Sequence, residues 1–301
     1  MQFLFKVFSL LSGLGIGFQK QYFMEKFTLE ILFQIIGIGS ASGLFFNNDS
    51  LYVIGDNSGF LYEYNIQNQQ LNQHALIDNP TQNIPKNLKP DFESLTSHND
   101  ALYIFGSGST ANRNKMIEFD LKSKTVLQKN NLVDLYALMQ NFGEIKPEDF
   151  NLEGAIFDGE NWYLFNRGNG ISNKNTIFTI HAKNLSEEFA LISVNYKLPK
   201  IKGVRSSFTD AVLVEDKIYF LSTAENTKST YDDGEVLGSF IGRIDLKTMK
   251  IDFTQKITST NKFEGLTLYK KESNKIEFLL CEDNDTELLE TKIYKLSLPI
   301  K

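Results

Sequence analysis

The amino-acid sequence predicts an all-β fold, a five-bladed β-propeller closed by a strand near its N-terminus. Three observations indicate this fold: a hairpin motif that occurs five times, a further strand after each hairpin, and an early strand with no hairpin partner of its own. The composition agrees, because 301 residues with 42% hydrophobic and 13% aromatic side chains are enough to fill a large core.

The five hairpin copies begin 51 to 60 residues apart, at Ser42, Glu93, Glu153, Asp210 and Glu264. This interval is close to the period of propeller blades that contain four strands. Each copy opens with a small or acidic residue, turns at Asn, Asp or Gly, and continues into a strand rich in aromatic and β-branched residues. A six-bladed propeller is the alternative, but it needs a sixth copy of the opening motif, which the sequence lacks.

A third strand follows each hairpin, over residues 60–66, 116–121, 177–182, 240–246 and 292–298. A weaker fourth strand, such as 250–257, follows the first four copies, whereas the fifth copy reaches Lys301 after three strands. Phe27 to Ile36 has the pattern of a strand without a hairpin partner. We therefore expect it to complete the last blade, which joins both ends of the chain in one sheet and leaves no open edge.

One segment departs from the strand pattern. Residues 134–143 have helical spacing, with Leu135, Leu138, Met139 and Phe142 on one face. This spacing predicts a short helix that caps a junction between blades.

The N-terminal segment has two interpretations. Residues 1–18 place Lys6 before an apolar run with small residues, which resembles a short signal peptide or a lipid-facing anchor. The run is too short and too rich in glycine for a stable membrane span. Translation from Met24 is the alternative, because a strand pattern follows directly. We thus divide the chain into residues 1–23, a signal peptide or upstream extension, and residues 24–301, one propeller domain. A signal peptide predicts an exported protein, and translation from Met24 predicts a cytoplasmic one.

Composition excludes several kinds of site. The net charge is −6 and the basic residues form no long run, so a nucleic-acid partner is not expected. With Cys281 as the one cysteine, neither an intrachain disulfide nor a thiolate metal cluster can form.

Polar residues recur at the two strand ends that meet in each hairpin. Antiparallel pairing places the start of the first strand beside the end of the second, so we expect both positions at one mouth of the central channel. The pairs are Ser42 with Asp56, Glu93 with Ser107, Glu153 with Arg167, Asp210 with Ala224, and Glu264 with Glu282. Further charged residues are expected within reach of the same mouth: Asp91, Arg205, Glu225 and Asp283.

Four carboxylates that converge repel one another unless a cation neutralises them. Hard divalent cations, Ca²⁺ foremost, take several carboxylate oxygens and provide such a counter-charge. Arg167 and Arg205 provide another, either as an internal ion-pair ring or as a clamp for an anionic ligand. A structural role is the alternative, in which each carboxylate accepts hydrogen bonds from backbone N–H groups of the neighbouring blade.

The opening motifs together resemble those of the phytase-like, esterase-like propeller family. The motifs are SGL from Ser42 with GDN after it, PDFESL, NLEGAIFDG, SFTDAVLV, and FEGLTL with CEDND after it. The likeness is closer to an uncharacterised branch of compact bacterial propellers. It implies an acidic mouth that holds Ca²⁺ and engages phosphate esters, with these candidate metal or mouth residues: Asp56, Glu93, Glu153, Asp210, Glu264 and Asp283. Ser94 and the pair Asp210–Ala211 depart from the pattern of the family.

Three functions are consistent with the sequence. The first is a binding propeller whose acidic mouth holds a divalent cation or a small polar or anionic ligand. The second is a Ca²⁺-dependent phosphoesterase, and the third is a scaffold that docks a protein partner on its flat faces.

Overall fold

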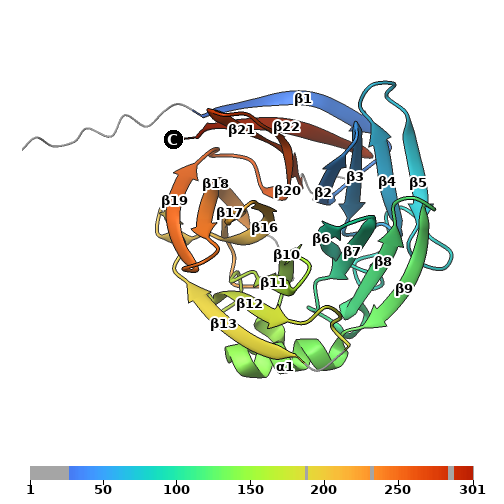
Figure 1. Ribbon diagram of the computed structural model, residues 1–301. Coiled ribbons are helices and arrows are strands. Elements are labelled where there is room, and N and C mark those ends of the chain that lie inside the picture. Colours follow the sequence, from blue (N-terminus) through green and yellow to red (C-terminus); the bar gives the residue numbers. More distant parts are fainter. Residues whose placement is uncertain (1–26, 187–188, 231–233, 284–287, 301) are drawn as a thin grey trace, which may run out of the picture.

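The computed structural model describes residues 27–186, 189–230, 234–283 and 288–300. Five antiparallel sheets of four strands each surround a central axis, so the predicted five-bladed propeller is confirmed (Figure 1). The segment over 1–23 and Met24 lie outside the described residues, and the two interpretations of the N-terminus stay expectations.

The blades follow one another along the chain. Blade 1 contains β2 (Ala41–Asn47), β3 (Ser50–Gly55), β4 (Phe60–Asn65) and β5 (Leu71–Ala75); blade 2 contains β6 (Phe92–His98), β7 (Ala101–Gly106), β8 (Lys115–Asp120) and β9 (Thr125–Asn131). Blade 3 contains β10 (Leu152–Phe157), β11 (Asn161–Asn166), β12 (Asn175–His181) and β13 (Ala190–Tyr196); blade 4 contains β16 (Ser207–Val214), β17 (Lys217–Asn226), β18 (Glu235–Asp245) and β19 (Lys250–Lys256). A small hairpin of β14 (Lys200–Ile201) and β15 (Val204–Arg205) precedes blade 4. Two short 3₁₀ turns are present: η1 (Ala111–Arg113) lies between β7 and β8 of blade 2, and η2 (Pro147–Asp149) precedes blade 3.

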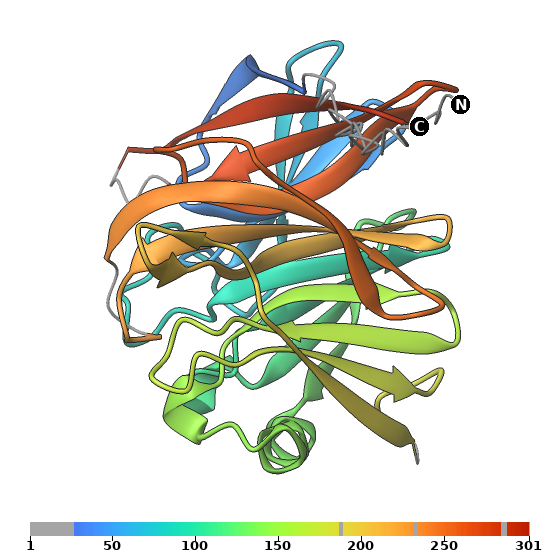
Figure 2. The same ribbon diagram turned by 90° about the vertical axis from the view of Figure 1, so that its left-hand side faces the viewer.

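Blade 5 is built from both ends of the described chain. It contains β20 (Phe263–Lys271), β21 (Lys275–Glu282) and β22 (Glu290–Pro299), and its outer strand is β1 (Thr28–Ile36). β1 pairs antiparallel with β22, and the two strands lie side by side in both ribbon views (Figures 1 and 2). The predicted closure by the N-terminal strand is therefore confirmed.

The core lies between the blades, as five apolar clusters that each join two neighbouring sheets. Strand β3 shows how the sequence produces this arrangement. Leu51 and Val53 pack toward blade 5, whereas Tyr52 and Ile54 pack toward blade 2. Because successive side chains of a strand point to opposite faces, a continuous apolar run fills both of the clusters beside it.

Helix α1 (Val133–Gly143) packs at the junction of blades 2 and 3, as predicted. The predicted apolar face was wrong in part: Leu135 and Met139 are buried, but Leu138 is 43% exposed and Phe142 is 53% exposed. Tyr136 takes their place in the core, where its hydroxyl donates to the carbonyl of Gly106. Across the described ranges, no helix combines the length and the apolar character needed to cross a membrane.

A β-bulge lies at the start of every inner strand. The pairing with the second strand skips one residue in each blade: Ser42, Glu93, Glu153, Thr209 and Glu264. A bulge re-aims the side chain of the extra residue and strengthens the local twist. The sequence alignment of blade 4 was therefore wrong by one residue, since Thr209, not Asp210, occupies the position of the three glutamates. In blade 5, Asp283 rather than Glu282 corresponds to Asp56, because Glu282 pairs with Phe263 as Gly55 pairs with Ala41.

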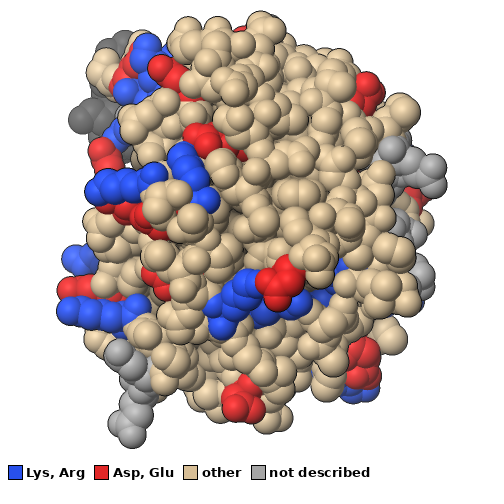
Figure 3. Space-filling model, turned by 90° about the vertical axis from the view of Figure 1, so that its right-hand side faces the viewer, with Lys and Arg blue, Asp and Glu red and all other residues tan. Residues whose placement is uncertain are grey.

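On the side formed by the outer strands of blades 1 and 2, Lys and Arg side chains are interspersed with Asp and Glu and separated by uncharged surface (Figure 3). Ion pairs on these blades join Lys129 to Asp78 at 2.8 Å and Lys122 to Asp100 at 2.6 Å. This face therefore carries charges of both signs rather than one basic patch.

Candidate cation site at the channel mouth

The inner strands begin around a cavity of about 600 Å³ at one mouth of the channel. Its lining is strongly charged, with seven carboxylates and five basic side chains among the described residues. The carboxylates are Asp56, Asp91, Glu93, Glu153, Glu225, Glu264 and Asp283, and the basic residues are Lys86, Lys89, Arg113, Arg167 and Lys262. Carboxylates thus exceed basic groups by two.

The bulge residues divide into two chemical classes. In blades 1 and 4 the bulge residue carries a hydroxyl group. Ser42 Oγ donates to the carbonyl of Phe92 at 2.5 Å, and Thr209 Oγ1 donates to the carbonyl of Phe263 at 2.7 Å. Each acceptor lies directly before the bulge of the next blade, so these hydroxyls link neighbouring blades. In blades 2, 3 and 5 the residue is a glutamate, which has no proton to donate when ionised and which lines the cavity instead.

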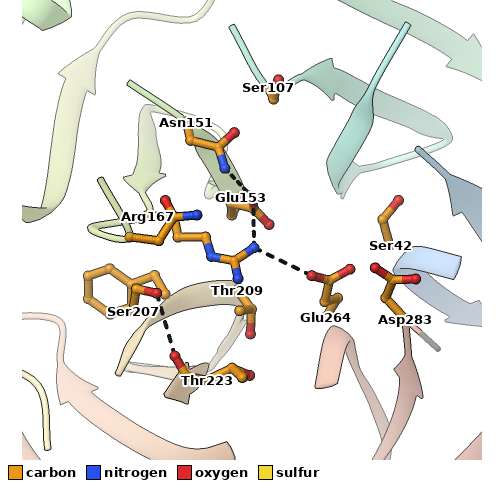
Figure 4. Close-up of polar contacts among 12 residues, drawn as sticks. Ser42, Ser107, Asn151, Glu153, Arg167, Ser207, Thr209, Thr223, Glu264 and Asp283 are labelled. Carbon is orange, nitrogen blue, oxygen red and sulfur yellow. Dashed lines mark hydrogen bonds and ion pairs between the residues drawn. The ribbon is translucent and has the colours of Figure 1, made fainter. Parts of the chain in front are cut away.

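Arg167, which directly follows β11, connects blade 3 to blades 4 and 5, and Figure 4 shows its side chain between Glu153 and Glu264. Its Nη1 lies 3.2 Å from Glu153 Oε1 and 3.5 Å from Glu264 Oε1, and its Nη2 lies 2.6 Å from Glu225 Oε2. Burial alone would lower the pKa of Arg167, but the three carboxylates outweigh it and raise the pKa above that of free arginine. The guanidinium is therefore a permanent internal counter-ion for this half of the cavity.

The other basic residues also contact carboxylates of the cavity. Lys262 Nζ lies 3.1 Å from Glu264 and 3.0 Å from Asp283. Arg113 Nη1 lies 2.7 Å from Asp91 Oδ2, and Lys89 Nζ contacts Asp56 and lies 2.9 Å from Asp91 Oδ1. These pairs neutralise most of the acidic residues from within the protein.

Glu93 is the exception among the cavity carboxylates. Its side chain is only 9% exposed and lines the cavity, yet no described residue gives its carboxylate a hydrogen bond or an ion pair. Burial, and then the charges of Asp91 and Glu153, raise its pKa well above the ordinary value. Two further oxygens, Asp56 Oδ1 and Glu153 Oε2, are buried without a hydrogen-bond partner in the described structure. Buried acceptor oxygens without a hydrogen-bond partner are stabilised by a proton or a cation.

Three carboxylates meet closely enough to hold a metal ion. One oxygen from each of Asp56, Asp91 and Glu93 lies within 4.8 Å of the other two. Oxygen ligands of calcium lie about 2.3–2.6 Å from the ion, so two ligands on opposite sides are separated by roughly 5 Å. The described geometry therefore fits a hard divalent cation.

Most of the residues predicted for the mouth lie together. Asp56, Glu93, Glu153, Arg167, Glu264 and Asp283 all line the cavity, whereas Asp210 and Arg205 are not among its lining residues. Arg205 lies in β15 and donates to the carbonyl of Leu198 at 2.9 Å.

Asp210 follows the structural alternative instead. Its Oδ1 accepts the backbone N–H of Ala211 and its Oδ2 accepts that of Leu266, both at 2.7 Å. Leu266 belongs to β20, so this carboxylate joins blade 4 to blade 5. Burial raises the pKa of Asp210 well above its ordinary value, while the two amides act in the opposite direction.

Sequence reasoning missed Lys89, Arg113 and Lys262. The sequence carries a signal for Lys262, because the residue two positions before the bulge is polar in every blade: Ser40, Asp91, Asn151, Ser207 and Lys262. Asn151 acts from this position, donating to Glu153 Oε1 at 2.6 Å. The position could have been found by extending the repeat alignment upstream of each inner strand.

Comparisons with known proteins bear on the fold and the family. No curated protein matches the chain. Among solved structures, the major Malassezia sympodialis allergen Mala s 1 is 13% identical with a TM-score of 0.58, covering 87% of this chain and 95% of the allergen. A member of the duf4221 family from Bacteroides vulgatus is 8% identical with a TM-score of 0.43, covering 92% of this chain and 98% of its own.

At 13% identity the likeness to the allergen concerns the fold alone. None of the comparisons supports the resemblance of the motifs to the phytase-like family. The sequence profile that matches residues 37–298 is described as Family of unknown function (DUF6929). This match spans most of the chain, which therefore belongs to the family DUF6929.

Proposed function

We propose that the protein is a binding propeller that holds a divalent cation, Ca²⁺ foremost, between Asp56, Asp91 and Glu93 at the channel mouth. The observation that carries the proposal is Glu93, a carboxylate about nine-tenths buried that has no partner among the described residues and lines the cavity beside two other carboxylates. A buried, unpaired carboxylate is costly, and a bound cation would remove that cost.

The charge balance of the cavity supports the same proposal. The lining has seven carboxylates and five basic side chains, so one divalent cation makes its formal charge neutral. The chemistry of the ligands points to a hard ion, because the described lining residues offer carboxylate and amide oxygens and neither imidazole nor thiolate.

A cation here would also serve the binding of a second molecule. The cavity measures about 600 Å³, far more than one ion needs, and its lining is almost entirely polar. A small polar or anionic ligand could reach the ion with its own oxygens and complete the coordination, since calcium takes six to eight oxygen ligands. Hydrolysis of phosphate esters finds no specific support, because Arg167, Lys89 and Lys262 already contact carboxylates of the cavity.

The test is thermal unfolding of chelated protein with and without calcium. We expect millimolar Ca²⁺ to raise the melting temperature by several degrees, because a ligand at 100 times its Kd stabilises the folded state by about 2.7 kcal/mol. Glu93→Gln should abolish this rise and, without calcium, should unfold at a higher temperature than the wild type. Glu160→Gln, at an exposed glutamate, is the matched control and should respond to calcium as the wild type does. An absent response to Ca²⁺, Mg²⁺ and Mn²⁺, or an undiminished one in Glu93→Gln, would refute the proposal.

A further inference from the structure

Lys89 lies on the segment between β5 and β6 and extends its ammonium group into the cluster proposed above to bind the cation. Its Nζ contacts Asp56 Oδ2 and lies 2.9 Å from Asp91 Oδ1. Asp56 and Asp91 are two of the three carboxylates that converge with Glu93. The ammonium is therefore a cation already held by the protein at the place where an added cation would bind.

We infer that Lys89 is a tethered competitor that makes this cluster selective for divalent over monovalent cations. The inference rests on the proposed cation site and adds its specificity. Exchanging one monovalent charge for another gains no Coulomb energy, whereas a divalent ion doubles the attraction to the same carboxylates. Tethering makes the ammonium an effective competitor, because a group on a short linker has a millimolar or higher effective concentration at its own site. A weakly attracted monovalent ion is then excluded, whereas a divalent ion can still bind.

The contacts around Lys89 hold its backbone in place but leave its side chain able to move. The backbone of Lys89 is held by its N–H to the carbonyl of Pro85 at 3.0 Å and by Asn112 Nδ2 to its own carbonyl at 3.0 Å. Its four-carbon stem is flexible, and Lys89 lines the cavity, so the ammonium has space to leave the carboxylates.

Arg113 has a different role at the same carboxylate. Its Nη1 bonds Asp91 Oδ2 at 2.7 Å and also Ser109 at 2.8 Å, while Nη2 donates to the carbonyl of Lys86 at 2.8 Å. A planar guanidinium fixed at several points is not readily displaced. Arg113 thus holds Asp91 in position, and Lys89 is the group that exchanges with the incoming ion.

The experiment compares Lys89→Met with the wild type by calorimetric titration of chelated protein with CaCl₂. We expect Lys89→Met to bind calcium at least tenfold more tightly. We also expect NaCl to raise the melting temperature of Lys89→Met but not of the wild type, with ionic strength held constant by tetramethylammonium chloride, whose cation is too bulky for the cluster. Lys129→Met, which breaks the exposed pair with Asp78, is the matched control and should change neither result.

The outcomes separate this inference from the proposed function. If neither the wild type nor Lys89→Met binds a divalent cation, the cation site itself is wrong. If the wild type binds calcium and Lys89→Met binds it no more tightly, only the role of Lys89 is overturned. Should Lys89→Met fold poorly, Lys89→Arg decides: its guanidinium competes more strongly for carboxylates, so calcium binding several-fold weaker than that of the wild type supports the inference and unchanged binding overturns it.

Discussion

The side chain at the bulge determines what each inner strand contributes to the channel mouth. Ser42 and Thr209 donate to a carbonyl of the next blade and so serve the fold. Glutamates at the same position cannot make that bond when ionised, and they line the cavity instead. One backbone feature, repeated in all five blades, thus supports either a link between blades or a charged site.

Asp210, the residue after the bulge of blade 4, has a structural role that a substitution can test. Asp210→Ala would leave the buried N–H groups of Ala211 and Leu266 without an acceptor, and we expect it to lower the free energy of unfolding by about 2–4 kcal/mol. Its response to calcium should match that of the wild type, because Asp210 does not line the cavity. Denaturant unfolding with and without calcium checks both statements. A stable Asp210→Ala variant that no longer responds to calcium would show that Asp210 is a ligand after all.

Glu63 gives a prediction for pH dependence. Burial would raise the pKa of its carboxyl, but hydrogen bonds from Lys124, His74 and Tyr52 outweigh burial and lower the pKa from 4.5 to about 2. Because the folded-state pKa is the lower one, this carboxylate contributes stability above about pH 4.5, and the contribution is lost as the pH falls toward 2.

The substitution Glu63→Gln should therefore lower the free energy of unfolding by about 1–3 kcal/mol at pH 7. Its deficit relative to the wild type should shrink steadily between pH 5 and pH 2, as measured by denaturant titration at each pH. A deficit that stays constant over this range would mean that the charge of Glu63 contributes nothing to stability.

At the level of elements, strand β1 determines whether the ring is closed. It supplies the outer strand of blade 5 and places Ile35, which is 1% exposed, in the cluster between blades 5 and 1. We expect Ile35→Ala to cost about 2–4 kcal/mol of unfolding free energy, through lost burial and a cavity. On the same strand Ile31 is 56% exposed, and Ile31→Ala is the control, with an effect within about 0.5 kcal/mol in chemical denaturation. Equal effects of the two substitutions would contradict closure by β1.

The strands and their order could be predicted from the sequence because each hairpin has its own pattern of turns and alternating side chains. The pairing of β1 with β22 could be predicted because the last repeat lacked a strand and the first residues supplied one. The position of the bulge could not be predicted from the sequence. In blade 4, Thr209 and Asp210 are both polar, and a shift of one residue at a strand start leaves the downstream apolar pattern unchanged.

The candidate site was predictable to the extent that it follows the repeat. Glu93, Glu153 and Glu264 begin equivalent strands, and ring closure brings equivalent positions to one axis. Lys89 and Arg113 lie outside the repeat, on a connecting segment and on η1, so their positions depend on loop conformation rather than on strand pairing. For that reason the sequence predicted the carboxylates of the cavity and missed most of the basic side chains that neutralise them.

At the level of the whole molecule, charged residues of the cavity connect separate blades. Arg167 joins carboxylates of blades 3, 4 and 5, whereas Asp56, Asp91 and Glu93 bring together blades 1 and 2. A cation at the second cluster would add ionic contacts between blades 1 and 2. We therefore expect cation binding to stabilise the propeller as a whole and not one blade alone.

The most direct test of the cation site is a crystal soaked in calcium or in a lanthanide substitute and examined by anomalous diffraction. We expect one anomalous peak at the channel mouth, within about 2.3–2.6 Å of an oxygen from each of Asp56, Asp91 and Glu93, with the ammonium of Lys89 moved away. A fully occupied peak elsewhere, or an empty cluster with Lys89 still on Asp56 at saturating cation, would contradict this expectation.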